Sequence, residues 1–444
     1  MTAGKVEEPV TYGFPAPLFQ AIEQKGRPPG PLFRPGLFRS PIRGPWLTSV
    51  FALVLLVGLP IVTITGLLSY AAYEPRFAEN AFPRDVGPLR LPYFAWPTDP
   101  AWLYRLNQGL HVSLGLALIP VVLAKLWSVV PKLFAWPPAR SLSQLLERLS
   151  LLLLVGSILF EIVTGVFNIQ YDYIWKFDFY TAHYYGAWVF IGAFVVHVFL
   201  HFPTMRRSLK ARSMRAELRT PVSATRPEPM DETGLVSPDP AEPTISRRGA
   251  LALVGGGSLA VTVLSIGQTL GDGFRPTALL SVRGQDYGDG PNDFQVNRTA
   301  GVAGITPELV GTGYRLTLLG GPMSVTLSLA DLFAMEQHTA RLPLACVEGW
   351  STVQTWTGVR LRDLMALAGV EELDRANVRS LERAGAFAQA TLSDRQVRHR
   401  NSLLALQVNG ADLSLDHGFP ARVIVPALPG VHNTKWVDEI EFFA

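Results

Sequence analysis

Five long apolar runs constrain this chain more than any other feature of its sequence. They cover approximately residues 47–71, 109–130, 149–170, 182–202 and 249–270. Each run is long enough to cross the roughly 30 Å of hydrocarbon in a bilayer as a helix. The composition agrees, because 48% of the residues are hydrophobic and 17% are charged, against about 25% charged in ordinary soluble domains. We therefore expect an all-α transmembrane helical bundle of about five spans.

Basic residues gather on one side of these runs. The segment 205–219 follows the fourth run and holds six basic residues and one acid, and further basic residues precede the first run and lie in the loop 131–148. The positive-inside rule places 1–45, 131–148 and 203–248 in the cytoplasm, so the carboxy-terminal part lies outside. The expected location is the inner (cytoplasmic) membrane, with the last domain on the periplasmic or extracellular side. The formal net charge is only +3, and a nucleic-acid partner is not expected.

Histidines within the apolar runs predict a haem site. Ionisable residues are costly in hydrocarbon and often functional there. His111 and His183 lie near the outer ends of the second and fourth runs, at similar depths, and two neutral imidazoles can ligate haem iron. His197 is a third candidate, but the residue at the matching depth of the second run is Lys125. We expect one b-type haem on His111 and His183 and leave a second haem open; a packing role for these histidines is the alternative.

Two other polar features of the runs have less specific interpretations. His197 and His201 are spaced to share a helix face, which leaves a different metal as a minor alternative. Glu161, in the third run, must be protonated or paired, and Lys125 is a conceivable partner. A proton path to a quinone is the functional interpretation of Glu161, and a structural polar contact is the alternative.

The order of apolar runs, basic segments and polar stretches predicts five parts, the last of which is the domain 276–444. Residues 1–45 form a cytoplasmic tail, 46–204 a four-helix transmembrane cytochrome b-like domain, and 205–248 a cytoplasmic basic segment with a flexible linker. The fifth span, 249–270, follows Arg247 and Arg248, which resemble a twin-arginine export signal. The alternative is a plain positive-inside stop. If the export interpretation holds, the twin-arginine machinery is a partner and the last domain crosses the membrane already folded.

From about 276 to 444 the chain changes character. Short alternating runs at 314–320, 323–329, 403–410 and 421–428 are typical of strands, and helices are expected near 328–337 and 361–369. This pattern predicts an α+β, sheet-rich domain. The single cysteine of the chain, Cys346, excludes an internal disulfide, a Cys-rich zinc site and an all-Cys iron–sulfur cluster. A lone cysteine is most often a buried small hydrophobe.

The motif CVEGW at 346–350, followed by WTGVRLRDLM at 356–365, resembles the molybdenum-binding domain of the sulfite oxidase group of molybdopterin oxidoreductases. The run LQVNGADLSLDHGFPARVIVPALPGVHNTKWVDEIEF at 406–442 resembles the cofactor-phosphate end of the same domain. The likeness spans about 290–443 and is nearest to the bacterial methionine sulfoxide reductase catalytic subunit group. It implies a molybdenum–molybdopterin cofactor and a Cys346 thiolate on molybdenum. The apolar half resembles cytochrome b561-like cytochromes more loosely, so the chain looks like a fusion of the two.

The resemblance also implies further cofactor contacts. A positively charged Arg or Lys suits a dianionic phosphate. The matching positions are Asn292, Gln295, Val296, Ser380, His417, Arg422, Asn433, Thr434 and Lys435. The sequence departs from the sulfite-oxidising members, which carry an arginine soon after the cysteine; here the next arginine is Arg360, which puts sulfite in doubt. Ser380 stands where the reductase group usually has threonine.

The expected function is that of a membrane-anchored molybdopterin-dependent oxidoreductase. Electrons would pass between a quinone or quinol pool, a membrane haem b and an external molybdenum centre. The expected reaction is reduction of a sulfoxide or another oxo substrate, either a small molecule or protein-bound. The alternatives are a quinone-reducing dehydrogenase of a small substrate such as a sulfur compound, and a non-catalytic anchored binding module.

Overall fold

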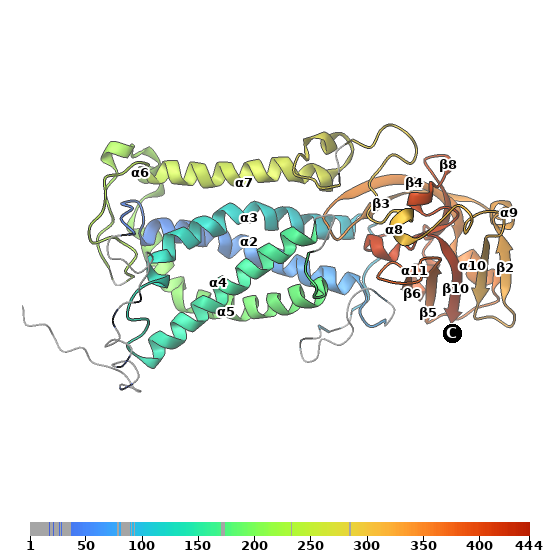
Figure 1. The fold of residues 1–444 in the computed structure, drawn as a ribbon, viewed down its shortest axis with the longest axis horizontal. Coiled ribbons are helices and arrows are strands. Elements are labelled where there is room, and N and C mark those ends of the chain that lie inside the picture. Colours follow the sequence, from blue (N-terminus) through green and yellow to red (C-terminus); the bar gives the residue numbers. More distant parts are fainter. Residues whose placement is uncertain are drawn as a thin grey trace, which may run out of the picture. The chain divides into compact units, whose positions relative to one another are not determined.

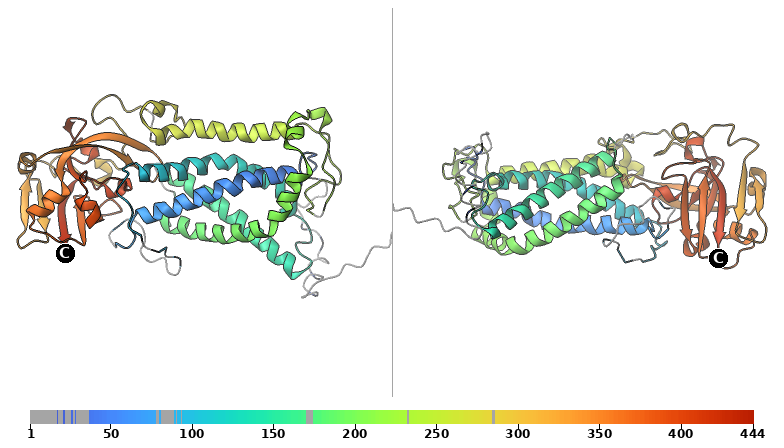
Figure 2. Two further views of the ribbon diagram at one scale, coloured as in Figure 1. Left: turned by 180° about the vertical axis from the view of Figure 1, so that it is seen from behind. Right: turned by 60° about the horizontal axis from the view of Figure 1, so that its bottom comes forward.

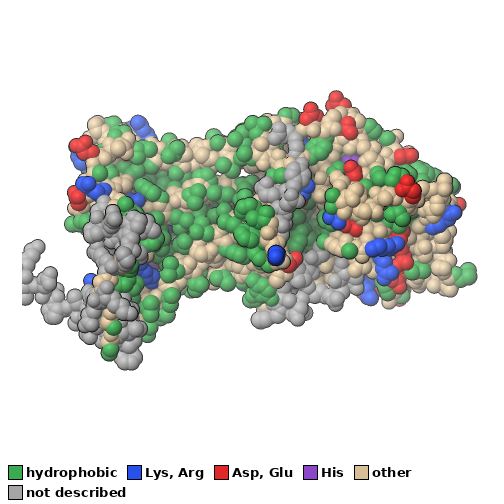
Figure 3. Space-filling model, in the orientation of Figure 1, with side chains coloured by type: hydrophobic (Ala, Val, Ile, Leu, Met, Phe, Trp, Pro, Cys, Tyr) green, Lys and Arg blue, Asp and Glu red, His purple; other side chains and the backbone are tan. Residues whose placement is uncertain are grey.

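The computed structural model describes residues 37–77, 80, 89, 91–92, 94–169, 174–231, 233–283 and 286–444, together with 17, 21, 26 and 28. Most of the expected tail at 1–45 lies outside these residues. Five of the described helices are long and apolar enough to cross a membrane. They are α2 (Pro45–Ala72), α3 (Leu103–Leu133), α4 (Leu142–Asn168), α5 (Phe179–Ala211) and α7 (Arg247–Leu270) (Figure 1). Each expected span falls on one of them. On the face drawn in Figure 3, hydrophobic side chains cover much of the helical part and charged side chains gather over the C-terminal domain.

The chain divides into two compact units built from several segments each. Unit 1 comprises Met1–Gly58, Leu118–Val163 and Tyr184–Ser258, and unit 2 comprises Leu59–Ala117, Thr164–His183 and Leu259–Ala444. Unit 2 therefore contains the C-terminal domain and one end of every long apolar helix. Its core includes Ala72, Trp96 and Tyr104 beside residues of the C-terminal domain such as Leu316 and Val425. The end of α2, the start of α3 and part of their connection thus belong to the same core as that domain.

Unit 1 holds the opposite ends of the helices and the segment after α5. That segment contains α6 (Met214–Arg219) and a short 3-10 turn, η3 (Val222–Ala224). Arg247 is buried and pairs with Glu217 at 3.4 Å and Glu228 at 3.8 Å, and the second oxygen of the Glu228 carboxylate accepts the Trp46 backbone N–H at 3.0 Å. The first arginine of the expected export signal therefore has partners inside unit 1.

The C-terminal domain is built on two sheets, one mixed and one antiparallel (Figures 1 and 2). The first has the order β2-β1-β10-β5-β6, and the second has the order β3-β4-β7-β8 with β9 paired to β7. All pairs are antiparallel except β1 with β10. The strands are β1 (Arg315–Leu319), β2 (Val325–Ser328), β3 (His338–Ala345), β4 (Ser351–Arg360), β5 (Arg375–Ser380), β6 (Gln389–Ser393), β7 (Leu403–Val408), β8 (Ala411–Asp412), β9 (Arg422–Ile424) and β10 (Val437–Phe443). The expected order, apolar helices followed by a sheet-rich domain, is confirmed.

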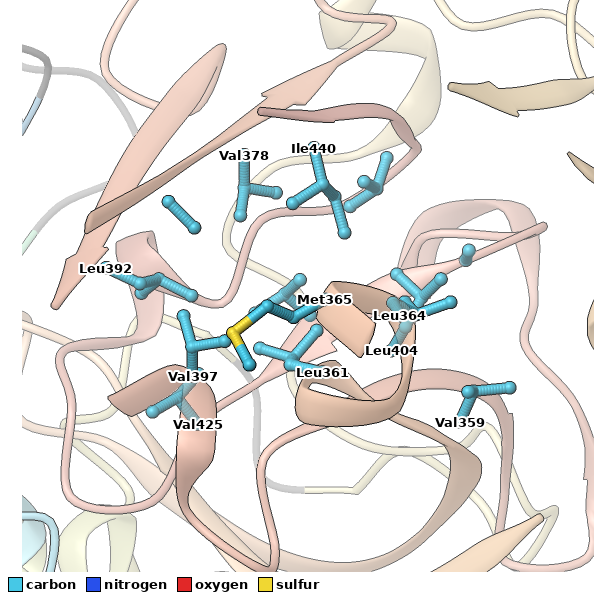
Figure 4. Close-up of a cluster of buried hydrophobic side chains, with 14 of the residues drawn as sticks. Val359, Leu361, Leu364, Met365, Val378, Leu392, Val397, Leu404, Val425 and Ile440 are labelled. Carbon is cyan, nitrogen blue, oxygen red and sulfur yellow. The ribbon is translucent and has the colours of Figure 1, made fainter. Parts of the chain in front are cut away.

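Short helices and 3-10 turns precede the first strand or connect later ones. They are α8 (Ala300–Ala303), α9 (Leu329–Ala334), α10 (Leu361–Leu367) and α11 (Asp394–Arg398), with 3-10 turns η4 (Asp272–Thr277), η5 (Leu415–His417) and η6 (Gly430–His432). The helices expected at 328–337 and 361–369 correspond to α9 and α10. Figure 4 shows side chains of α10, both sheets and α11 converging, among them Leu364, Val378, Val397 and Leu404. Alternate residues of β7 belong to two different core clusters, with Leu404 and Leu406 in this one and Leu403 and Ala405 in another, so this strand is buried on both faces.

Candidate molybdenum and haem sites

Cys346 lies in the loop that joins β3 to β4. These strands pair up to Ala345 and Ser351, so the loop consists of residues 346–350, which we call the cysteine loop. It is closed by two backbone hydrogen bonds of 3.0 Å, from Cys346 N–H to the Trp350 carbonyl and from Gly349 N–H to the Cys346 carbonyl. Gly349 has a φ of +92°, and a Cβ there would lie 2.7 Å from a Val112 methyl carbon. A side chain at 349 is therefore excluded by both conformation and space.

The thiol of Cys346 is buried and the charges of its loop are paired. Burial raises the pKa of the Cys346 thiol above its ordinary value, so a metal would have to displace its proton. Glu348 accepts two hydrogen bonds from Arg283, of 2.7 and 2.5 Å, and a third from the Trp350 indole at 3.0 Å. The Glu348 carboxylate and the Arg283 guanidinium therefore compensate each other beside the cysteine.

A second group of polar residues is assembled from distant parts of the domain. Arg422 begins β9 and donates to the His417 carbonyl at 3.3 Å, while His417 Nε2 lies 2.8 Å from the Asn292 carbonyl. Ser380, at the end of β5, donates to the Lys435 carbonyl at 2.8 Å. Gly418, with a φ of +109°, lies between them, since a Cβ there would lie 3.1–3.2 Å from the Cβ atoms of Lys435 and Arg422. We call Ser380, His417, Arg422, Asn433, Thr434 and Lys435 the anchor cluster.

The anchor cluster contains buried polar atoms that have no hydrogen-bond partner among the described residues. They are Arg422 Nε, His417 Nδ1, Asn433 Nδ2 and Thr434 Oγ1. Buried polar groups in native proteins are normally paired. Three of these atoms carry hydrogens in any protonation state, so the cluster offers donors to a ligand rich in acceptors. A phosphate-bearing pterin has that chemistry.

The charges of the anchor cluster also favour a phosphate-bearing ligand. Desolvation lowers the pKa of Arg422 to about 9 and holds the pKa of Lys435 well below its ordinary value. Lys435 Nζ donates to the carbonyls of Arg298 and Asp416, at 2.6 and 2.8 Å. Two cations held close in a buried site need an anion to compensate them. A dianionic phosphate fits the residues present.

Three of the predicted cofactor contacts, Asn292, Gln295 and Val296, lie outside the anchor cluster as defined above. Gln295 is buried against Arg275, and its side-chain oxygen accepts hydrogen bonds from the Arg275 guanidinium. Asn292 uses its side chain to bind the Asp412 carbonyl and the Ser414 N–H, at 2.9 and 2.7 Å, so it shapes the loop before His417. Val296 is half-buried. All three remain predicted contacts of the cofactor.

Sequence reasoning missed several neighbours of these residues. Phe294 stacks on the His417 ring with centroids 3.6 Å apart. His432 is buried with Nε2 unpartnered among the described residues, and its ring meets Tyr73 edge-on at 5.4 Å. The position of His432 beside Asn433 in GVHNTK was an available signal. No local signal pointed to Tyr73, which directly follows the end of α2.

The histidines of the long helices form two separate pairs. The His111 and His183 rings lie 6.3 Å apart, centre to centre, and are inclined by 84°. His111 Nδ1 is 2.9 Å from the Val62 carbonyl and His183 Nδ1 is 3.0 Å from Thr164 Oγ1. Each Nδ1 therefore lies within hydrogen-bond distance of an oxygen, and such a contact would orient the imidazole if its other nitrogen bound a metal.

The second pair is formed within α5. His197 lies 4.6 Å from His201, ring centre to ring centre, and His201 Nε2 is 3.6 Å from the Glu147 carboxylate. Lys125 Nζ donates to the Thr48 carbonyl at 3.1 Å. The described residues contain no group of three or more His, Cys, Asp or Glu side chains arranged to hold a metal ion. The arrangement therefore brings His111 and His183 together and gives His197 a different neighbour.

Comparisons with known proteins identify the C-terminal domain. Residues 303–444 match the family model "Oxidoreductase molybdopterin binding domain". Mitochondrial sulfite oxidase of Rattus norvegicus is 31% identical over 166 residues, which cover 30% of this chain and 30% of that protein. The uncharacterized oxidoreductase YuiH of Bacillus subtilis is 34% identical over 117 residues, covering 26% of this chain and 58% of that protein. The sulfane dehydrogenase SoxCD of Paracoccus pantotrophus overlaps 30% of this chain and 38% of its own, with 24% identity and a TM-score of 0.27.

The chain thus spans about 30% of the length of the sulfite oxidases that it matches. The segment 303–444 contains Cys346 and every residue of the anchor cluster. Over residues 303–444 the chain matches an oxidoreductase molybdopterin-binding domain and is similar to sulfite oxidases, which supports the expectation of a molybdenum cofactor-dependent oxidoreductase.

Proposed function

We propose that this chain is a membrane-anchored oxidoreductase that reduces a sulfoxide or another oxo substrate with electrons taken from a quinol through a haem b. The observation that carries the proposal is that a domain matching a molybdopterin-binding model holds both a buried single thiol and a group of buried donors that have no partner among the described residues. Cys346 would hold the molybdenum as a thiolate, a soft ligand to a high-valent metal. Arg422 and Lys435 would hold the phosphate, with Asn433, Thr434 and His417 as hydrogen-bonding partners.

The bound cofactor would supply the two-electron oxygen-atom chemistry. The protein residues would orient it and exclude water. The cysteine loop keeps the thiol buried, and Gly418 leaves room for the side chains of Arg422 and Lys435. The compensated charge of the Arg283–Glu348 pair favours a substrate without net charge, because it leaves no excess positive charge from this pair to attract an anion.

The haem part of the proposal rests on the His111–His183 geometry. If both histidines bound one iron, each ring centre would lie one metal–nitrogen bond of about 2 Å from the iron, plus the distance from that nitrogen to the ring centre. The two ring centres would then be about 6 Å apart. The rings lie 6.3 Å apart. Because the Nδ1 atoms are engaged by Val62 and Thr164, the Nε2 atoms are the ones to bind iron. Lys125 stands where a second haem would need the partner of His197, and its ammonium donates to the Thr48 carbonyl. This supports one haem rather than two.

The membrane part of the proposal rests on the five apolar helices and the charge of their flanks. We place 203–248 in the cytoplasm and the C-terminal domain on the periplasmic or extracellular side. Reporter fusions at Pro238 and at the carboxy terminus should report opposite sides. The same side for both would refute the topology. Arg247→Lys with Arg248→Lys tests the export route, because it keeps the charge while changing the arginines; a metal-loaded domain that still reaches the outside would exclude that route.

The second candidate is the reverse reaction, oxidation of a small sulfur compound with electrons delivered to quinone. The likeness to sulfite oxidases favours it. One preparation of detergent-solubilised protein separates the candidates. Molybdenum analysis and a reduced-minus-oxidised optical spectrum establish the two centres, and turnover with methionine sulfoxide or with sulfite establishes the direction. We expect one molybdenum, one b-type haem and reduction of the sulfoxide. Protein without molybdenum, or with activity on sulfite alone, would refute the proposed reaction.

A further inference from the structure

The cysteine loop is held by side chains of two apolar helices. The Gln108 side-chain amide, on α3, donates to the Val347 carbonyl at 2.6 Å. The Thr269 hydroxyl, on α7, donates to the Gly349 carbonyl at 2.6 Å. Both side chains are buried, with 3% and 9% of Gln108 and Thr269 exposed. The loop that carries the molybdenum ligand is therefore bonded to both helices within unit 2.

The orientation of Gln108 is fixed by a second contact. Ser69 Oγ, on α2, donates to Gln108 Oε1 at 2.8 Å and lies 3.4 Å from the Tyr104 hydroxyl. The amide nitrogen must then face Val347, because turning the amide over would set its oxygen against the Val347 carbonyl, which has no hydrogen to donate. Gln108 is therefore one fully bonded link between the loop and α3.

The same turn of α3 carries the haem ligand candidate His111. Residues three apart lie on one face of a helix, so Gln108 and His111 share a face. The next residue, Val112, lies against Gly349 so closely that a Cβ on Gly349 would come within 2.7 Å of it. The cysteine loop thus contacts α3 on both sides of His111, through a hydrogen bond before it and a van der Waals contact after it.

We propose that Gln108 is the electron-coupling residue between the two redox centres: its hydrogen bond to Val347 links the Cys346 loop to the helix turn of His111. This inference rests on the proposed haem and molybdenum sites. Electron tunnelling weakens steeply as the gap between bonded groups widens. The hydrogen bond brings the two groups to 2.6 Å, whereas carbon atoms in van der Waals contact lie about 3.5–4.0 Å apart. The Gln108 link is therefore the tighter of the two loop contacts with α3.

The transfer balances with the proposed reaction. A quinol is oxidised to a quinone and releases two electrons and two protons. The bound haem would pass these electrons to the molybdenum centre one at a time. Reduction of one sulfoxide consumes both electrons and two protons, breaks the sulfur–oxygen bond and yields a sulfide and water. Gln108 takes no part in proton transfer, because its amide keeps both of its hydrogens.

The test compares two variants that each remove one hydrogen bond to the cysteine loop. Gln108→Leu removes the bond from α3, and Thr269→Val removes the bond from α7, a helix without a haem ligand candidate. The full-length protein is reduced at its haem by a laser flash with deazaflavin, and the haem absorbance is followed as the electron moves to the molybdenum centre. We expect Gln108→Leu to slow this relaxation about tenfold, equivalent to about 1.4 kcal/mol of barrier, while Thr269→Val stays within about twofold. Ser69→Ala, which frees the amide to turn, should slow it less.

Further readouts separate coupling from loss of structure. Haem content, molybdenum content and both reduction potentials should be unchanged in Gln108→Leu. Equal slowing in Gln108→Leu and Thr269→Val would assign Gln108 a purely structural role and overturn the proposal. Unchanged relaxation in Gln108→Leu would also overturn it. If Gln108→Leu folds poorly, an unchanged relaxation rate in Ser69→Ala would overturn it instead. Wild-type protein that lacks haem would instead overturn the proposed function.

Discussion

A glycine opposite His111 allows the haem site to be perturbed without changing a ligand. A Cβ at Gly66 would lie 2.8 Å from His111 Cε1 and 3.1 Å from Nδ1. Carbon atoms in contact prefer about 3.5 Å or more, so Gly66→Ala must displace the ring by about 0.7 Å. That movement disturbs the 2.9 Å contact between Nδ1 and the Val62 carbonyl. The ring would then be both shifted and released from the group that orients it.

The expected consequence is weaker haem binding. Loss of a group that orients a metal ligand costs about 10–100-fold in affinity, and we expect haem release from Gly66→Ala to accelerate by that factor. Helix instability would not explain such a loss, since alanine replacing glycine within a helix adds about 0.5–1 kcal/mol of stability. The assay is transfer of haem from the solubilised protein to excess apomyoglobin, with the reduced-minus-oxidised spectrum as a check of ligation.

Gly165 supplies the matched control. A Cβ there would lie 3.7 Å from His183 Cε1, an ordinary contact distance. Gly165→Ala should therefore keep the native release rate and spectrum. A native release rate in Gly66→Ala, or equal acceleration in both variants, would refute the assignment of His111 and the reasoning from this geometry.

Three further predictions concern the C-terminal domain. Cys346→Ser should abolish turnover and release molybdenum while the haem spectrum persists; normal turnover would remove the central claim. Arg422→Met should lower molybdenum content, yet raise the melting temperature of cofactor-free protein by removing an uncompensated buried charge worth about 1–3 kcal/mol. Burial and the nearby Arg422 and Lys435 lower the pKa of His417 from 6.5 to about 3, so its contribution to stability is complete above pH 6.5 and declines as the pH falls toward 3. His417→Gln should flatten that decline in unfolding titrations of cofactor-free protein, and an unchanged slope would contradict it.

Local sequence patterns were sufficient for the elements and for the chemical class. The length and apolarity of each run predict a long helix, because a helix that crosses hydrocarbon must satisfy its backbone internally and present apolar side chains around its circumference. The alternation from 314 onward predicts strands for a similar local reason. The resemblance carried by CVEGW and by the run 406–442 implied Cys346, Arg422 and Lys435 as cofactor contacts, and their chemistry suits a soft metal ligand and a phosphate.

The pairings depend on the tertiary structure. Depth along the helices predicted His183 as the partner of His111, but only helix packing sets the 6.3 Å between their ring centres and places His197 beside His201. Gln108 and Val347 are separated by 239 residues, yet they share a hydrogen bond. His432 and Tyr73 likewise meet across most of the chain. Such contacts arise when distant segments bury one another, and the periodicity of any single segment carries no information about which partner it will meet.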